Sequence, residues 1–521
     1  MKYFIVFPEK LYLECRNFLL RDLYNEQFGY LLAGVNQVTD QYVKLLVHTF
    51  LPAKNHDDLE YQTTGGICPS PNFQMGVYSK CKKEGHHLID MHSHPFDTSG
   101  YVQFSGIDNR YEFGNGREGV FGFTAMWNPG MYHASIVFGQ NSLDARIYCS
   151  EIGRAVPIDE IRILRSIIPT SALLLSNQQR ATLIHTRKET PLQTTEFPNE
   201  INVREKKKKR TIFGDEFGSG SCSNFDDLYS RQILAFGKVG QESLANTVVA
   251  VVGAGGIGSI IVEIFARLGV KEIICVDDDV IEISNISRVL GTYIQDAESH
   301  IEKVKVLQRH VKAINPKIIY TPVVDTILDP QALGILKRAD FIISGTDTYS
   351  SRVVLNRFAV QYLIPYIDLG FGMETDRNHE RIISAGGKVI TYIPGNWCLH
   401  CLNELDQREL QLELMRKEDR ERQVTRGYIS GVDIPNPSVI FLNMVVASLG
   451  TCEFLNLLVP FKKRLNYIFY DMLLTKLWTV KANQDPECPI CSPEAEILGR
   501  GDLLALEDIR DSERRDIPNN L

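Results

Sequence analysis

The chain has 521 residues, of which 44% are hydrophobic and 23% charged, and its net charge is -8. This length exceeds what one core can organise, so we expect two or three domains. The mild acidity argues against nucleic acid as the main partner, and the one basic cluster, at 206–210, is interpreted as part of a solvated linker. We expect neither a signal peptide nor a membrane span, because no apolar run is long enough.

The N-terminal part, residues 1–160, is predicted to be a compact α/β domain. Short apolar runs at 28–34, 42–52 and 132–139 alternate with Gly, Asn and Asp turns, which is typical of strands. A segment at 161–226 follows, with a helical start. From about residue 187 it becomes a linker rich in Thr, Gln, Lys, Gly and Ser, which is too polar to bury a core.

Two histidines in the first part favour a metal site. His92 and His94 end an apolar stretch, and residues two apart on a strand point to the same face, where both imidazoles reach one ion. Ser105 and Asp108 lie one helical turn apart, and Glu26 precedes another apolar strand. Two His and one Asp leave a fourth zinc position open for water, which marks a catalytic site and requires a general base. The alternative, that the histidines are satisfied polar residues beside a turn, is less consistent with the whole pattern.

These residues resemble the JAMM (MPN-plus) metalloprotease motif, a Glu followed by H-x-H-P and S-x-x-D. The resemblance covers about the first 150 residues and implies a cytidine-deaminase-like α/β fold. It also implies catalytic Zn²⁺ on His92, His94 and Asp108, an acid/base role for Glu26, and help from Ser105 in holding the oxyanion. The stretch between His94 and Ser105 is longer than is usual in that family, which predicts an enlarged surface loop.

The second part, residues 227–500, opens with a different pattern. A continuous apolar run at 247–252 suits a strand buried on both faces, and a Gly-rich turn, a helical stretch and a second strand at 272–276 follow it. This βαβ unit predicts a doubly wound parallel sheet of the Rossmann type. Residues 501–521 are predicted to be a charged, frayed tail.

The same part carries a set of residues that suits a nucleoside triphosphate. The turn of Gly253, Gly255, Gly256 and Gly258 offers backbone N–H groups to a phosphate chain, and Asp277 ends the next strand, where it would serve a ribose hydroxyl. These features also fit an NAD site. ATP is favoured by the cations that follow and by a carboxylate placed to hold Mg²⁺. The further residues of this set are Asp279, Asn285, Arg288, Lys303 and Asp347, with Arg352 and Asn356 on the next helix.

Together these residues resemble the ThiF/MoeB and ubiquitin-activating (E1-like) adenylation fold, over about 228–495. The resemblance implies that ATP and Mg²⁺ are used to adenylate the C-terminal glycine of a ubiquitin-like protein. The segment 228–233 resembles the family's N-terminal helix, from which Arg231 would reach the partner's ATP site across a homodimer interface. An ordinary surface role for Arg231 is the alternative. Thr348 stands where the family usually has Asn, and its hydroxyl still offers a hydrogen bond.

Four of the eleven cysteines form two C-x-x-C pairs, Cys398 with Cys401 and Cys488 with Cys491. Four thiolates predict a closed, structural Zn²⁺ site in a reducing cytoplasm, whereas a redox role would need only one pair. A thioester cysteine is not evident, because Gly427 stands where the resemblance expects one. Cys452 lies in an apolar helical stretch, and Cys222 in the linker is the remaining candidate.

The leading hypothesis is a bifunctional cytoplasmic enzyme that processes and activates a ubiquitin-like protein. An E2-like partner would carry the acceptor cysteine. The fusion of the two halves resembles prokaryotic ubiquitin-like systems, some of which serve in antiphage defence. One alternative is activation of a sulfur carrier for thiamin, molybdopterin or cysteine synthesis. Another is a binding module for ubiquitin-like tails in which the sites are inactive.

Overall fold

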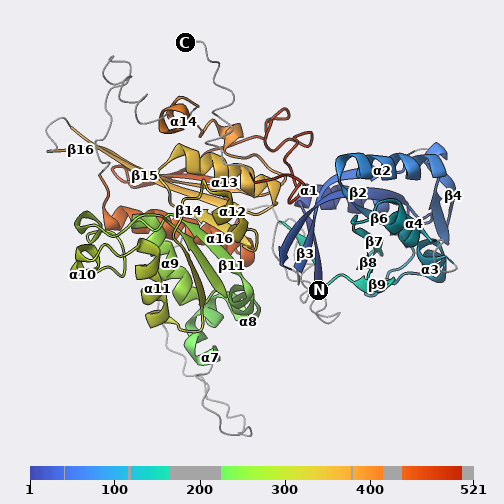
Figure 1. Cartoon of the computed structure of the whole chain (residues 1–521), viewed down its shortest axis with the longest axis horizontal. Coiled ribbons are helices and arrows are strands. Elements are labelled where there is room, and N and C mark those ends of the chain that lie inside the picture. The colour runs from blue at the N-terminus through green and yellow to red at the C-terminus, as the bar shows by residue number, and fades with distance from the viewer. Residues whose placement is uncertain are drawn as a thin grey trace, which may run out of the picture.

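The computed structural model describes residues 1–39, 42–54, 56–114, 119–164, 225–376, 380–405, 407–414 and 437–506. These residues form two eight-stranded sheets and one two-stranded sheet (Figure 1). Of the expected linker, residues 187–224 lie outside the described residues, and these include the basic cluster at 206–210 and Cys222. Its last two residues, 225 and 226, belong to a helix.

The N-terminal half is one mixed sheet in the order β10-β1-β3-β2-β6-β7-β8-β9, with a small β4–β5 hairpin at its side. The predicted end at residue 160 falls inside β10, which continues to Ile163 and pairs with β1. The elements are β1 (Lys2–Phe7), α1 (Glu9–Leu19), β2 (Phe28–Thr39), β3 (Tyr42–Pro52), η1 (His56–Asp58), β4 (Leu59–Thr63), β5 (Gly66–Pro69), α2 (Pro71–Glu84), β6 (His87–Ser93), α3 (Gly106–Phe113), α4 (Val120–Trp127), β7 (His133–Phe138), β8 (Leu143–Cys149), β9 (Arg154–Pro157) and β10 (Glu160–Ile163).

Strand β2 shows why this sheet is covered on both faces. Leu31 and Ala33 belong to the apolar cluster that includes the buried face of α1. The alternate residues Tyr30 and Leu32 belong to a second cluster with α2. Because side chains alternate across a strand, one apolar run can support two layers of helix. The strands expected at 28–34, 42–52 and 132–139 are confirmed as β2, β3 and β7.

The C-terminal half is a second sheet in the order β13-β12-β11-β14-β15-β16-β17-β18. The first five strands in this order are parallel, and β15 to β18 pair antiparallel. The elements are α7 (Phe225–Leu228), α8 (Ser230–Asn246), β11 (Val248–Val252), α9 (Gly256–Leu268), β12 (Glu272–Val276), η2 (Ile283–Asn285), α10 (Ile294–Glu298), α11 (Lys303–Ile314), β13 (Ile319–Val323), α12 (Pro330–Leu336), β14 (Phe341–Ser344), α13 (Tyr349–Gln361), β15 (Tyr366–Thr375), β16 (Ile382–Tyr392), η3 (His400–Leu402), α14 (Gln407–Leu414), α16 (Ile440–Leu458), β17 (Tyr467–Asp471) and β18 (Lys476–Thr479).

Strand β11 lies at the centre of this half and is buried on both faces, as its sequence predicts. Val249 and Val251 face the cluster formed with α9, α11 and α16, whereas Val248 and Ala250 face the cluster formed with α12 and α13. Its neighbours in the sheet are β12 on one side and β14 on the other. The chain runs outward from β11 through β12 and β13, and then returns to the other side of β11 with β14. The strand order therefore reverses at β11, and this creates a crevice at the carboxyl ends of β11 and β14, where doubly wound folds bind ligands.

One described helix, α16, is long and apolar enough to span a membrane, although 56% of its most apolar window is buried within the protein. It packs against α9, β15 and β16. Asn443, Glu453 and Asn456 are buried within it. Its central position in the core thus explains its apolar composition.

A buried ion-pair network joins the two halves. Asp340, directly before β14, pairs with Arg162 of β10 and lies 3.9 Å from Lys44 of β3. Its other oxygen accepts a hydrogen bond from the backbone N–H of Val248, at 3.0 Å. Apolar residues of the N-terminal half, Val6 among them, also belong to the core cluster of the C-terminal half. The halves therefore pack as one unit.

The chain end contributes to the same junction. Gly501 pairs with Val35 of β2, and Asp502 forms an ion pair with Lys337 at 2.5 Å and accepts a hydrogen bond from the Tyr362 hydroxyl at 2.9 Å. The expectation of a frayed tail beginning at residue 501 is thus wrong for 501–506, because these groups find partners in both halves. Residues 507–521 lie outside the described part of the chain.

We predict that Asp340→Asn destabilises the junction by about 3 kcal/mol at pH 7, because the largely buried Arg162 and Lys44 lose their shared anion and only Glu160 still pairs with Arg162. Burial by itself raises the pKa of Asp340, but Arg162 and Lys44 outweigh this and hold it below its ordinary 3.8. A carboxylate whose pKa is lowered by folding stabilises the protein above that range and loses its effect as the pH falls through it. The difference from the unchanged protein in chemical unfolding should therefore shrink below about pH 4.

The matched control is Glu298→Gln, which neutralises an exposed carboxylate of α10. It should change the unfolding free energy by less than about 0.5 kcal/mol. Equal effects of the two substitutions would show that the junction does not depend on Asp340.

Candidate functional sites

The two histidines and the aspartate of the N-terminal half come together as expected. His92 is the penultimate residue of β6, His94 directly follows that strand, and Asp108 lies in the first turn of α3. The ring Nε2 atoms of His92 and His94 lie 3.2 and 3.4 Å from the two carboxylate oxygens of Asp108. Ligands about 2.05 Å from a tetrahedral zinc lie about 3.3 Å apart. The three side chains thus fit one ion, and the buried His92 Nε2 has no hydrogen-bond partner that would replace it.

Glu26 lies beside these three residues, directly before β2. Its carboxylate is 3.8 Å from His94 Nε2, and the side chain is only 3% exposed. The β4–β5 hairpin fixes its backbone, since its N–H donates to Thr63 and its carbonyl accepts from the Gln62 side chain. Burial raises the pKa of Glu26 to about 7, against the opposing effect of the histidines. A carboxyl group with such a pKa exchanges protons readily near neutrality.

Ser105 caps α3. Its hydroxyl accepts from the N–H groups of Ile107 and Asp108, and its own N–H donates to the Asp108 carboxylate at 2.5 Å, which completes a capping box. The serine therefore orients Asp108, and the role of its hydroxyl toward an oxyanion stays a prediction. The long segment before it is anchored to the β7–β8 turn, where Val102 donates its N–H to the Ser142 hydroxyl.

The glycine turn of the C-terminal half lies between β11 and α9, at the crevice of the second sheet. Gly253 has a φ of 89°, and a Cβ at Gly258 would lie 1.7 Å from the Gly253 carbonyl oxygen. Only glycine allows so tight a turn, and this turn leaves the N-terminus of α9 open to a phosphate chain. Gly255 is the N-cap and Gly256 the first residue of α9.

Asp277 and Lys303 converge on this turn. The Asp277 carboxylate accepts from the N–H of Ala254, inside the turn, at 2.6 Å. Lys303 is 8% exposed, and its ammonium group lies 2.6 Å from Asp279 and 3.8 Å from Asp277. Burial raises the pKa of Asp277, and Lys303 opposes this shift. The site thus holds a cation beside the glycine turn, and Asp279, 68% exposed, neutralises it.

Two further predicted residues follow on η2 and the turn after it. Asn285 is buried, and its side chain accepts from the N–H of Glu282. The Arg288 guanidinium donates to the Ser284 carbonyl at 2.7 Å and is partly exposed. Asn285 therefore shapes the turn, while Arg288 remains accessible to a ligand.

The loop after β14 borders the same crevice. A Cβ at Gly253 would lie 3.2 Å from the Gly345 backbone, so the two turns are in contact. Asp347 is exposed in this loop. Thr348 caps α13, accepting from the N–H of Ser351 and donating to its hydroxyl at 2.6 Å. The expectation that Thr348 retains a hydrogen bond in place of the usual Asn is thus met.

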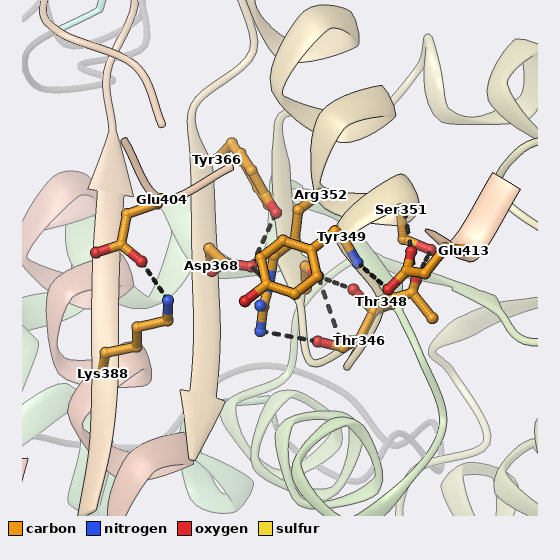
Figure 2. Close-up of polar contacts among 11 residues, drawn as sticks. Thr346, Thr348, Tyr349, Ser351, Arg352, Tyr366, Asp368, Lys388, Glu404 and Glu413 are labelled. Carbon is orange, nitrogen blue, oxygen red and sulfur yellow. Dashed lines mark hydrogen bonds and ion pairs between the residues drawn. The ribbon is translucent and has the colours of Figure 1, made fainter. Parts of the chain in front are cut away.

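Figure 2 shows polar contacts beside this loop that the sequence did not indicate. Arg352 of α13 lies 3.3 Å from Asp368 of β15 and donates to the Thr346 carbonyl at 3.2 Å. Asp368 also accepts from the Tyr366 hydroxyl, at 3.0 Å. A charged residue in the middle of a buried strand was the signal available for Asp368. The network fixes the direction of the loop that carries Asp347.

Glu413 of α14 was also missed. Its two oxygens accept from the backbone N–H groups of Tyr349 and Ser350, each at 2.8 Å (Figure 2). A carboxylate that binds at the first turn of a helix satisfies backbone N–H groups that have no partner within that helix. It also complements the positive end of the helix dipole. Nothing in the local sequence could show that α14 would reach α13.

The four paired cysteines come together, as predicted, and they pack in the same core cluster as residues of α13. Cys398 Sγ lies 3.8 Å from Cys488 Sγ, and Cys401 Sγ lies 3.4 Å from Cys491 Sγ. Thiolates about 2.3 Å from a tetrahedral zinc lie about 3.8 Å apart, so the four sulfurs fit one ion. Asn356 accepts from the N–H of Leu399 in this knuckle, at 3.0 Å. It therefore supports the cysteine cluster.

The remaining predicted residues lie apart from these sites. Arg231 is exposed on α8, and the exposed residues near it include Leu234 on the same helix and Leu228 at the end of α7. Cys452 is partly buried on α16, in keeping with a packing role. Gly427, where a thioester cysteine was expected, lies outside the described residues.

Comparison with known proteins identifies the C-terminal half. SAMP-activating enzyme E1 of Haloferax volcanii is 27% identical over 287 residues, which cover 54% of this chain and 92% of that enzyme. Molybdopterin-synthase adenylyltransferase of Escherichia coli is 26% identical over 267 residues, or 50% of this chain and 95% of that protein. A crystal structure of E. coli MccB with ATP has 22% identity and a TM-score of 0.40, over 51% of this chain and 74% of that one.

The ThiF family model matches residues 229–490, which are 262 of the 521 residues and so just over half of the chain. This range contains the glycine turn, Asp277, Lys303 and the Asp347 loop. The chain therefore belongs to the ThiF family, and its C-terminal half is an E1-like adenylyltransferase domain of the ThiF/MoeB type.

Proposed function

We propose that the C-terminal half uses ATP to adenylate the C-terminal carboxylate of a ubiquitin-like or sulfur-carrier protein. The observation that carries this proposal is the convergence of the glycine turn, Asp277 and Lys303 at the sheet crevice. The names of the relatives support the substrate class, since they include a SAMP-activating enzyme and a sulfur carrier protein adenylyltransferase.

In this reaction a carboxylate oxygen of the carrier protein attacks the α-phosphorus of ATP, and the bond to the bridging oxygen breaks to release pyrophosphate. The N–H groups of the glycine turn and the first turn of α9 bind the phosphates. Lys303 and Arg288 neutralise the charge that gathers on the leaving group, and Asp277 orients the ribose. Asp347 is the residue that we propose would hold Mg²⁺, which would supply positive charge to the phosphates when bound.

We propose that the activated carboxylate then passes to an acceptor outside this chain. That acceptor is either the cysteine of an E2-like partner or a sulfur donor, since a thioester on this chain would need a thiolate near the adenylate. The relatives named for sulfur carriers favour the sulfur donor. A binding module with inactive sites is the remaining alternative, and the buried Lys303 beside the phosphate turn argues against it.

We predict that Lys303→Gln lowers the rate of ATP–pyrophosphate exchange, measured with the carrier protein present, by about a hundredfold or more, because it removes the cation from the phosphate site. The control is Lys305→Gln, two residues along α11, where the lysine is exposed and pairs with Glu302. This control should exchange at the unchanged rate. Full exchange activity in Lys303→Gln would contradict the proposed role, and no exchange in the unchanged protein would favour the binding module.

We also propose that this half works as a homodimer in which Arg231 completes the partner's ATP site. The exposure of Arg231 and Leu234 on α8, and of Leu228 at the end of α7, supports a protein partner at these two helices, because exposed apolar side chains in a group mark interaction surfaces.

Arg231→Ala and Asp347→Ala should each abolish exchange, and a mixture of the two proteins should recover part of it. The reason is that a mixed dimer contains one site with both residues intact. The test is to refold or co-express the two variants together and to measure exchange and mass by light scattering. An active monomer would contradict the proposal.

For the N-terminal half we propose a JAMM-type zinc isopeptidase that cleaves after the C-terminus of a ubiquitin-like protein. His92, His94 and Asp108 would hold the ion, which supplies an activated water when bound. Glu26 would hold the proton taken from that water and deliver it to the leaving amine. The fit of the three ligands to a tetrahedral ion and the buried Glu26 beside them support this proposal.

Metal analysis should find two zinc ions per chain, one at this centre and one at the four cysteines. Glu26→Gln should retain both ions but cleave a carrier fusion at least a hundredfold more slowly, because proton transfer is lost while the ligands remain. The control Glu14→Gln changes an exposed carboxylate of α1 and should cleave normally. A single zinc that is lost when Cys491 is replaced by Ser would contradict the isopeptidase assignment.

A further inference from the structure

The helix that carries Asp108 is too short to hold its own position. Helix α3 has eight residues, and isolated helices of this length are marginal in water. Only Asp108 and Glu112 are buried among its side chains. The position of Asp108 relative to the two histidines must therefore be fixed by contacts from outside the helix.

One side chain of β8 supplies such contacts at several points. The Arg146 guanidinium donates to Asn109 at 2.7 Å and pairs with Glu112 at 2.5 Å, so it holds the residue after Asp108 and the residue one turn further on. The side chain of Arg146 is 16% exposed and that of Glu112 is 2% exposed. An ion pair of this burial, together with a hydrogen bond to a second residue of the same helix, defines a geometry more strictly than a surface ion pair does.

The same guanidinium also holds the segment before the helix. It lies 3.7 Å from the centre of the Phe104 ring and 5.3 Å from that of Phe113. Phe104 precedes Ser105, and its ring lies 6.0 Å from the ring of His92. Arg146 thus contacts both sides of the pair Ser105–Asp108, and through Phe104 it reaches the ring of a second predicted ligand.

We infer that Arg146 is a positioning residue of the N-terminal metal centre, which fixes α3 so that Asp108 completes the set of ligands begun by His92 and His94. This inference rests on the proposed metal-dependent function of the N-terminal half. It assigns Arg146 no contact with substrate or metal. Its effect passes through Asn109, Glu112 and Phe104.

The test is the zinc affinity of each site in the full chain, measured by competition with a chromophoric chelator. Arg146→Met keeps an unbranched apolar side chain against Phe104 and removes the donors. It should weaken the N-terminal site by about 10- to 100-fold, the range seen when residues that orient metal ligands are changed. Zinc at the four cysteines and ATP–pyrophosphate exchange should not change. Arg146→Lys keeps the charge beside Glu112 but not the forked donors. Its zinc affinity at the N-terminal site should therefore lie between those of the unchanged protein and Arg146→Met.

Two further variants separate positioning from general stability. Arg154→Met, on β9, removes an exposed arginine and should leave both zinc affinities unchanged. Asn109→Ala removes an exposed acceptor without burying any group, so it tests the contact even if Arg146→Met folds poorly. If Arg146 acts through Asn109, the double variant should lose less affinity than the sum of the two single effects.

The outcomes distinguish this inference from the proposed function. Two zinc ions in the unchanged protein, with unaltered N-terminal affinity in Arg146→Met and Asn109→Ala, would overturn the positioning role and leave the isopeptidase proposal intact. A single ion in the unchanged protein, held by the cysteines, would overturn both. Selective loss from the N-terminal site in Arg146→Met, partly restored in Arg146→Lys, is the expected result.

Discussion

The structure depends on one buried carboxylate, that of Asp340. It accepts the N–H of Val248 at the start of the central strand β11 and pairs with Arg162 on β10, the edge strand of the other sheet. Because a buried charge is tolerated only where it is paired, this carboxylate holds the first residue of β11 in one sheet against the edge strand β10 of the other sheet. The apolar residues Val6, Leu46 and Leu164 complete this contact within the core of the C-terminal half. Two halves with separate proposed chemistries are thereby built as one packed unit.

The two halves form their sites by different means. The N-terminal centre is made of side chains that converge from β6, the loop before β2 and the short helix α3, so it depends on tertiary contacts such as those of Arg146. The C-terminal site is made largely of backbone, because the glycine turn and the start of α9 present N–H groups at the sheet crevice. Beside this turn, the ammonium group of Lys303 pairs with the exposed carboxylate of Asp279.

Much of this organisation could be predicted because it is encoded over short distances. The spacing of His92 and His94 follows from the alternation of a strand, and the capping box of Ser105 and Asp108 from the first turn of a helix. The turn at Gly253 requires a residue without Cβ. Each C-x-x-C pair predicts a metal knuckle by its own spacing. In all of these cases backbone geometry over a few residues relates the sequence to the structure.

Other features depended on the path of the whole chain. Cys398 and Cys488 are 90 residues apart, and Arg162 and Asp340 are 178 apart, so their pairing is decided by how the sheets pack. For the same reason the contacts of Glu413 with α13 and of Arg146 with α3, and those of Gly501 and Asp502 in the junction, could not be found from local patterns. By itself the sequence indicated the two α/β halves, the residues that we predict for metal and nucleotide binding, and the ThiF-type turn. Only the tertiary structure decided which charges pair, because pairing requires burial and burial is a property of the packed chain.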